Sequence, residues 1–144
     1  MQPLDLSKQA PRSPKVKVGG LIVLARTIDK MRAALPGGNM GAYNIPGFST
    51  RMLEAIGVDP DQLQAEVARA GSEDEVVAWV RAHSDPARYD EVNKRLGARS
   101  IKDIAPENLD SFRSKYPHHA QAPSDLIVDI MEHDDTKLFE KVPG

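Results

Sequence analysis

Cysteine is absent from this chain of 144 residues. Without it the protein has no disulfide cross-links, no thiolate nucleophile and no cysteine-ligated zinc, so its stability has to come from packing. Long apolar runs are absent too, because the longest, residues 21–25, falls far short of the about 20 residues that span a membrane. Residues 1–19 hold three prolines and scattered Lys and Arg, unlike a signal peptide or an anchor. We therefore expect a cytoplasmic protein with no membrane partner.

The chain also lacks an excess of positive charge. Its 19 Lys and Arg stand against 21 Asp and Glu, a formal net charge of -2, so it has no overall positive field that would draw it to a phosphate backbone. We expect no nucleic-acid partner. A chain of this length is typical of one domain with one hydrophobic core.

The apolar residues follow a helical pattern, and strand signals are nearly missing. From Gly20 onward they recur at spacings of three and four, which mark the buried face of a helix. Residues 1–19 are expected to form an extended arm, and residues 20–144 a single all-α domain of six to seven short helices. Only residues 16–18 and 42–45 could pair, as a small ribbon. Helices are predicted directly after Ser72 and within residues 20–35, 49–56, 60–71, 86–96, 106–115 and 124–133, with an irregular glycine-rich loop after the first.

Local signals mark where several helices begin and end. Asp59 followed by Pro60 combines an N-cap with a proline at the first helical position. Ser72 and Glu75 have the spacing of a capping box, in which each side chain satisfies a free amide at the helix start. We expect Gly57 to end the helix of residues 49–56, because glycine adopts the left-handed conformation that ends many helices.

The most informative candidate site lies on the first predicted helix. Arg26, Asp29 and Lys30 are three and four positions apart, so one helix face would present two cations and a carboxylate. Asp29 could then orient Arg26 for bidentate contact with a small anion, and Gly20 would leave amide donors at the helix start. Tyr43 would join them if the chain doubles back. The alternatives are a solvated surface ion pair and a structural tyrosine.

Other known site patterns are missing, so no cofactor is predicted. Residues 37–41 are rich in glycine but follow a helix and lack a Gly-Lys-Ser or Gly-Lys-Thr sequence, unlike a phosphate-binding loop. No Gly-x-Ser-x-Gly nucleophile elbow occurs. His118, His119 and His133 could supply a metal set with nearby carboxylates only if the tail folds against their loop, and no metal is predicted. The position of His133 favours a cap near a helix end.

Several segments resemble a known family. They are residues 10–14, 19–20, 24–33, 41–43, 53–57 and 79–80. Together they are similar to a bacterial family of small proteins catalogued only as a domain of unknown function. The recurrent marks of that family are a Pro-Arg-Ser-Pro arm, an Arg-x-x-Asp-Lys helix and a Gly-x-Tyr turn. The resemblance covers about the first 80 residues, implies no reaction, and does not extend to a matching pattern after Ala87.

Two functions of different classes remain open. In the first, a small binding or accessory protein recognises a small anionic ligand or an acidic group of a partner through Gly20, Arg26, Asp29, Lys30 and Tyr43. In the second, a small enzyme uses Asp29 as general base, Lys30 or Tyr43 as proton donor and Arg26 to anchor a substrate carboxylate. A homodimer is a further possibility, if the helix with the single tryptophan leaves an apolar patch uncovered.

Overall fold

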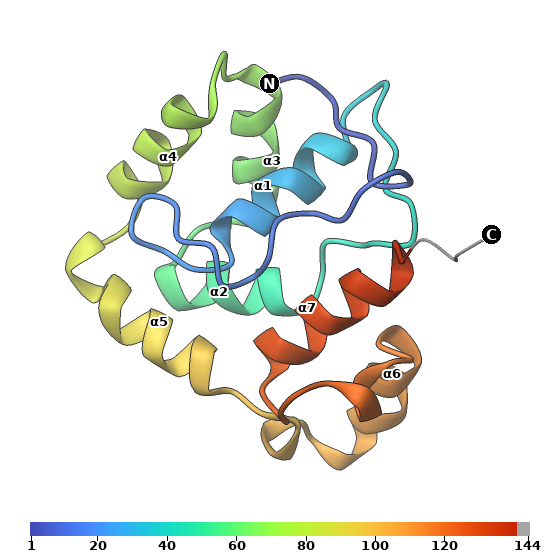
Figure 1. The fold of residues 1–144 in the computed structure, drawn as a ribbon. Helices are drawn as coiled ribbons and strands as arrows, with labels where there is room; N and C mark the ends of the chain where they lie inside the picture. Colours follow the sequence, from blue (N-terminus) through green and yellow to red (C-terminus); the bar gives the residue numbers. More distant parts are fainter. Residues whose placement is uncertain (141–144) are drawn as a thin grey trace.

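The computed structural model describes residues 1–140. Within them the chain forms seven α-helices and four short 3-10 turns, and no β-strand (Figure 1). The helices are α1 (Leu24–Ala33), α2 (Phe48–Ile56), α3 (Pro60–Arg69), α4 (Glu73–Ala82), α5 (Tyr89–Ala98), α6 (Leu109–Lys115) and α7 (Ile127–Leu138). The predicted all-α fold of a single domain is confirmed. The ribbon of residues 16–18 and 42–45 is wrong, because Val18 pairs with Leu21 instead.

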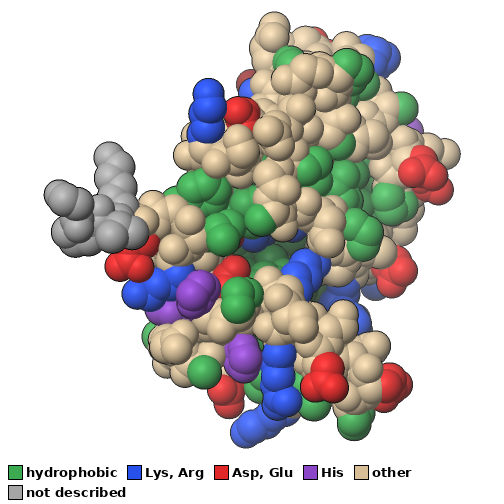
Figure 2. Space-filling model, turned by 90° about the vertical axis from the view of Figure 1, so that its right-hand side faces the viewer, with side chains coloured by type: hydrophobic (Ala, Val, Ile, Leu, Met, Phe, Trp, Pro, Cys, Tyr) green, Lys and Arg blue, Asp and Glu red, His purple; other side chains and the backbone are tan. Residues whose placement is uncertain are grey.

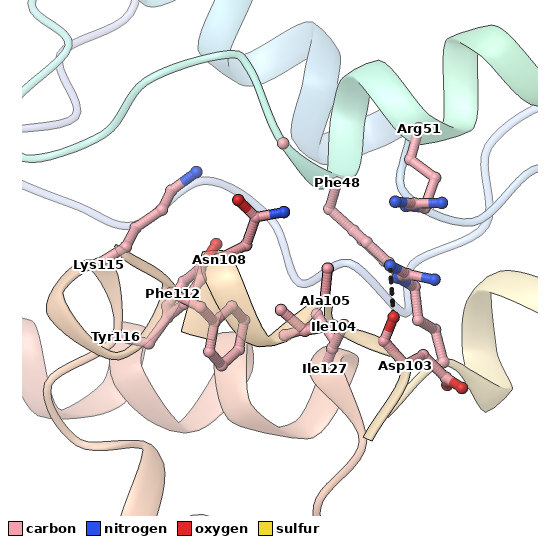
Figure 3. Close-up of a pocket in the computed structure, with 12 residues that line it drawn as sticks. Phe48, Arg51, Asp103, Ile104, Ala105, Asn108, Phe112, Lys115, Tyr116 and Ile127 are labelled. Atoms are coloured by element: carbon pink, nitrogen blue, oxygen red, sulfur yellow. Dashed lines mark hydrogen bonds between the residues drawn. The ribbon is translucent and has the colours of Figure 1, made fainter. Parts of the chain in front are cut away.

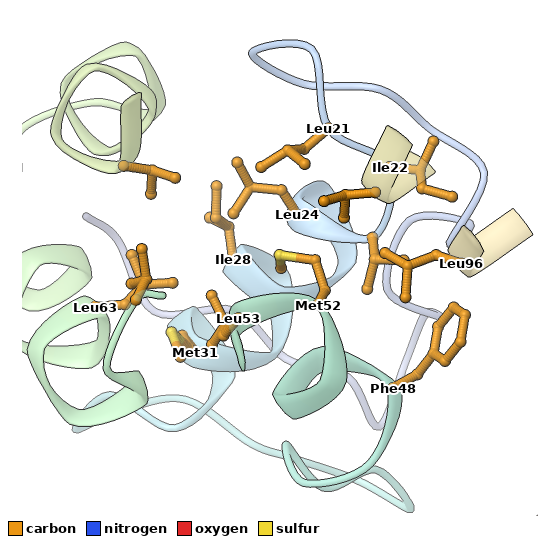
Figure 4. Packing of buried hydrophobic residues seen from close by; sticks show 14 of the residues in the cluster. Leu21, Ile22, Leu24, Ile28, Met31, Phe48, Met52, Leu53, Leu63 and Leu96 are labelled. Atoms are coloured by element: carbon orange, nitrogen blue, oxygen red, sulfur yellow. The ribbon is translucent and has the colours of Figure 1, made fainter. Parts of the chain in front are cut away.

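Helix α1 lies in the middle of the bundle (Figure 1) and packs against α2 and α3. Its apolar side chains Leu24, Ile28 and Met31 are at most 1% exposed. Figure 4 shows them beside Met52 and Leu53 of α2, which are fully buried. Among residues 1–140, no helix is long and apolar enough to cross a membrane.

The charged residues of α1 are buried along with its apolar ones. Arg26 is 1% exposed, Lys30 3% and Asp29 5%. The interpretation of these residues as a solvated surface ion pair is therefore wrong. Because a charge removed from water is costly unless it is paired or hydrogen-bonded, the surroundings of these side chains decide what the helix does.

The start of α1 differs from the prediction. Helix α1 begins at Leu24 and not at Gly20, because Gly19 and Gly20 have φ angles of 61° and 89° and form a tight turn. Val18 and Leu21 close this turn with two backbone hydrogen bonds of 3.0 and 3.1 Å. Positive φ at both central positions suits glycine. Gly20 therefore does not present its amide at a helix N-terminus.

Helix ends marked by local signals are confirmed more closely. The Asp59 carboxylate accepts hydrogen bonds at the start of α3, where Pro60 is the first residue. Gly57 ends α2 with a left-handed φ of 75°. The Ser72 hydroxyl accepts the amide of Glu75 at 3.3 Å, but the Glu75 carboxylate accepts the amide of residue 71 and leaves the capping box half formed.

Helix α7 lies further along the chain than the predicted residues 124–133. Ser124 makes a turn before it: its hydroxyl accepts the amide of Leu126 at 3.1 Å and donates to the Asp129 carboxylate at 2.5 Å. His133 consequently lies inside α7, and its predicted place as a cap near the helix end is wrong.

Residues 1–19, which were expected to form an arm, cross α1 without regular secondary structure (Figure 1). We call this segment the strap. Leu6 in it is fully buried. Farther along, the Ser13 hydroxyl donates to Glu132 of α7 at 2.6 Å, and Lys15 pairs with Asp129 of the same helix at 2.5 Å. These contacts connect the strap to α7.

The single tryptophan, Trp79, lies on α4. It is partly buried against the core, and its ring stacks on His83 with centroids 4.1 Å apart. His83 follows the last residue of α4. The homodimer suggested for this helix stays a prediction.

Candidate functional site

Arg26 is at the base of the candidate site. Its guanidinium forms a bidentate pair with Asp135 of α7, with Nη1 to Oδ2 2.6 Å and Nη2 to Oδ1 3.2 Å. The Tyr43 hydroxyl donates to the same carboxylate at 2.7 Å, and the guanidinium carbon lies 5.5 Å from the Tyr43 ring centre. Tyr43 comes from the glycine-rich loop, so the chain doubles back over α1. A buried charge pair of this geometry holds three segments in one arrangement.

Lys30 lies one turn further along α1, and its environment is different. The Nζ atom is 5.9 Å from the centre of the Tyr43 ring, yet within residues 1–140 it makes no hydrogen bond or ion pair. The pKa of Lys30 is lowered to about 7, mainly by burial and further by the nearby charges of Arg26 and Lys115, while Asp135 opposes the shift. The amine therefore changes its charge close to neutral pH.

These side chains line a cavity of about 520 Å³ between α1, the glycine-rich loop, α6 and α7. We call it the cationic cavity. Its lining residues are Arg26, Lys30, Ala42, Tyr43, Asn44, Ser111, Ser114, Lys115, Tyr116, Pro117, Asp134 and Leu138. Figure 2 looks onto this side of the molecule and shows a hollow with Lys and Arg side chains at its edge and in its depth. A concave site with few, converging polar groups is typical of small-ligand binding.

Three further titratable groups line the cavity with shifted pKa values. Partial burial and Arg26 lower the pKa of Lys115. Burial raises the pKa of Tyr116 to about 12. Burial also raises the pKa of Asp134, although the amide of His118 donates to its carboxylate at 3.3 Å. Every one of these shifts disfavours the charged form, which indicates poor solvation at the cavity wall.

Asp29, the carboxylate predicted to act with Arg26, faces elsewhere. Its carboxylate accepts the Arg12 amide at 2.8 Å, the Arg12 Nε at 3.1 Å and the Arg12 Nη2 at 3.0 Å. The same guanidinium also pairs with Glu73 of α4. Helix geometry explains the separation, because residues one and four positions apart differ by about 100° and 40° in direction. Lys30 therefore follows Arg26 toward the cavity, and Asp29 turns to the strap.

Gly20 is not part of the cavity either. Its carbonyl accepts the Asn93 side-chain amide at 2.8 Å, and a Cβ at this position would lie 3.4 Å from the Tyr89 ring. Of the five predicted site residues, the structure brings Arg26, Lys30 and Tyr43 together and leaves Asp29 and Gly20 outside.

Sequence reasoning missed the acidic partner of the site. Asp134 and Asp135 were not among the predicted site residues, but they are buried, at 7% and 8% exposed. A signal was present: each lies four positions after a buried apolar residue of α7, Ile130 or Met131, and so falls on the same helix face. Lys115 gave no such signal, because it is the last residue of α6 and is exposed as a whole.

The histidines do not gather into a metal site within residues 1–140, where no group of three or more His, Asp or Glu side chains could hold an ion. The tail does fold against the loop, since the His118 amide reaches Asp134. The Nδ1 of His119 instead lies 2.9 Å from the carbonyl of Tyr116. The Nε2 of His133 is buried without a partner among the described residues.

Fold and site together define a small all-helical protein with a buried cationic cavity. The chain belongs to the family described as domain of unknown function (DUF5069), whose model matches residues 8–137. The match includes the strap from residue 8 onward, α1 and nearly all of α7, so the similarity extends well beyond the first 80 residues. A comparison with curated proteins gives no match.

Proposed function

We propose that the protein binds a small anion, a carboxylate or a phosphate, in the cationic cavity. The observation that carries this proposal is Lys30: it is 3% exposed, borders the cavity, and has no carboxylate partner within residues 1–140. A buried ammonium without a counter-charge is costly and tends to lose its proton. An anionic ligand would supply the missing charge and restore the proton.

The charge balance of the cavity supports a ligand of negative charge. Arg26 and Asp135 neutralise each other, which leaves Lys30 and Lys115 as cations against one further carboxylate in the lining, that of Asp134, whose pKa is raised by burial. Arg26 then acts as a support that holds Asp135 and Tyr43 in place. The volume of about 520 Å³ falls within the about 300–1,000 Å³ of sites for small molecules, which favours a small ligand over an acidic side chain of a partner.

The test is calorimetric titration with succinate, whose carboxylates stay ionised from pH 6 to 9. Binding should weaken about tenfold for each pH unit above the pKa of Lys30, because the ammonium form binds and each unit costs about 1.4 kcal/mol. Lys30→Met should abolish it while keeping the length of the side chain. The matched control is Lys102→Met, which changes an exposed lysine outside the cavity.

Two results would contradict the proposal. One is equal affinity of wild type and Lys30→Met for succinate, inorganic phosphate and glycerol 3-phosphate, which would place any binding elsewhere. The other is an equal loss of affinity in Lys102→Met, which would mean that overall charge and not the cavity attracts the anion.

An enzymatic function has one specific observation in its favour, the pKa of Lys30 near 7. An amine that is neutral at physiological pH can act as a base or add to a carbonyl group. Asp29 is unsuited to the general-base role first considered, because it is bound by Arg12. Trapping with pyruvate and borohydride tests the amine: a stable adduct in wild type and none in Lys30→Met would support the enzyme, and no adduct in either would exclude imine chemistry with this probe.

A further inference from the structure

A second cavity, of about 530 Å³, opens between α2, the segment after α5, and α6 (Figure 3). Its lining is largely aromatic and aliphatic, and we call it the aromatic cavity. Phe48 and Tyr116 are each 8% exposed and Ile127 is 5% exposed. These three buried side chains form the floor of the cavity. Ile104 and Phe112 are half-buried around them. Apolar side chains bordering open space leave a surface that gains free energy when an apolar group covers it.

Two arginines lie at one edge of this cavity. Arg51 comes from α2 (Figure 3), and Arg99 is the residue that follows α5. Within residues 1–140 neither forms an ion pair with a carboxylate. The Arg99 Nη2 donates only to the backbone carbonyl of Asp103 at 3.4 Å. The Asp103 carboxylate is used locally, because it accepts the Ser100 amide at 2.8 Å.

The two guanidinium groups also influence each other. Burial lowers the pKa of Arg99, and the positive charge of Arg51 lowers it further. Arginine stays protonated at any physiological pH, so the edge of the cavity holds two cations against one carboxylate, that of Asp103, which raises the pKa of Arg99 without forming an ion pair with it. A planar anion between two guanidinium groups would satisfy both by bidentate hydrogen bonds.

We propose that the aromatic cavity binds an amphipathic organic anion. Arg51 and Arg99 hold its carboxylate or phosphate, and an aryl or short alkyl body lies on Phe48, Phe112 and Ile127. The combination of a charged edge with an apolar base distinguishes this ligand from the small anion of the cationic cavity. This inference does not depend on the function proposed there.

The wall between the two cavities makes them separate sites. Lys115 and Tyr116 line both. The Lys115 Nζ donates to the carbonyl of Pro46 at 3.1 Å, and its side chain lies over the Tyr116 ring at 5.7 Å. This bridge from α6 to the chain before α2 lies between the two cavities, whose other lining residues differ.

The experiment is titration with 4-phenylbutyrate and octanoate, followed by calorimetry and amide chemical shifts. Both should bind, whereas acetate and the neutral 4-phenylbutanol should bind at least tenfold more weakly. The double change Arg51→Gln and Arg99→Gln should weaken 4-phenylbutyrate at least tenfold. Phe112→Ala should weaken it as well. Arg113→Gln is the matched control, since this arginine is exposed on α6 and does not line the cavity.

The outcomes separate the two sites. Unchanged affinity for 4-phenylbutyrate in Lys30→Met supports the inference, whatever happens to succinate. If Lys30→Met loses affinity for 4-phenylbutyrate and the double arginine variant retains it, the inference is overturned, because the anion then binds in the cationic cavity. Equal loss in Arg113→Gln would overturn it too, as would equal affinity for 4-phenylbutanol. Thermal unfolding of each variant confirms that the fold is intact, as expected for arginines at the surface.

Discussion

The two charged sides of α1 differ in whether every charged side chain has a partner of opposite charge. On the strap side, Asp29 accepts three hydrogen bonds from Arg12, and Glu73 adds a second carboxylate to the same guanidinium. On the cavity side, the pair of Arg26 and Asp135 is complete, but the neighbouring Lys30 has no such partner within residues 1–140. The strap side therefore has a structural role. On the cavity side, an anionic ligand would supply the missing partner of Lys30.

The largest effect is expected from breaking the pair on the cavity side. Asp135→Ala leaves the Arg26 guanidinium buried and unpaired, which should cost about 3–5 kcal/mol of the free energy of unfolding. Urea unfolding measures it. The double variant Arg26→Met and Asp135→Leu should recover much of the loss, since apolar replacement removes the unpaired charge. A loss below about 1 kcal/mol in the single variant would contradict the burial of this pair.

The next effect is the pH dependence that Lys30 confers. Its folded pKa, about 7, lies below that of an unfolded lysine, about 10.4. Between these values the unfolded state binds more protons, so the Lys30 contribution to the free energy of unfolding rises with pH, by at most about 1.4 kcal/mol per unit. Wild type minus Lys30→Met, measured by urea unfolding from pH 7 to 9, isolates it. A difference that is flat or falls with pH would contradict the depressed pKa.

A smaller effect is expected on the strap side. Arg12→Ala leaves the carboxylate of Asp29 without its two side-chain donors and keeps only the backbone amide, at a cost of about 2 kcal/mol, because hydrogen bonds to charged groups contribute about 1.5–3 kcal/mol. The partial exposure of Arg12, 36%, keeps the cost below that of the cavity pair. Hydrogen exchange of residues 8–16 should quicken as the strap loosens. Lys17→Ala, an exposed change on the same segment, should leave both readouts unchanged.

Helix ends were predictable where the signal is local. Asp59, Pro60 and Gly57 act through the amides and φ angles of their own neighbours, and the sequence pattern placed them well. The start of α1 could not be predicted in this way, because Gly19 and Gly20 suit both the beginning of a helix and a two-residue turn. The bond from Val18 to Leu21 that decides between them is not visible in composition or periodicity.

The candidate site was predictable only from its α1 side. Arg26 and Lys30 stood out by spacing, and Tyr43 by its place after a glycine-rich loop. Asp135 is 109 positions from Arg26 along the chain, and its approach depends on how α7 packs across α1. Helix geometry turns Asp29 away from Lys30, but only that packing decides which of the two directions on a central helix faces the cavity.

Tyr43→Phe is the smallest change that separates the two sides of α1. It removes the 2.7 Å hydrogen bond to Asp135 and keeps the ring beside Arg26 and Lys30, so the free energy of unfolding should fall by about 1–2 kcal/mol. Because Asp135 then becomes a freer acceptor, the pKa of Lys30 should rise, which the pH profile of succinate binding would report. Hydrogen exchange of the strap should stay as in wild type. Faster exchange there would mean that the two sides of α1 are coupled, through the helix or through the hydrogen bond of 3.4 Å from the Arg26 Nη1 to the Arg12 carbonyl.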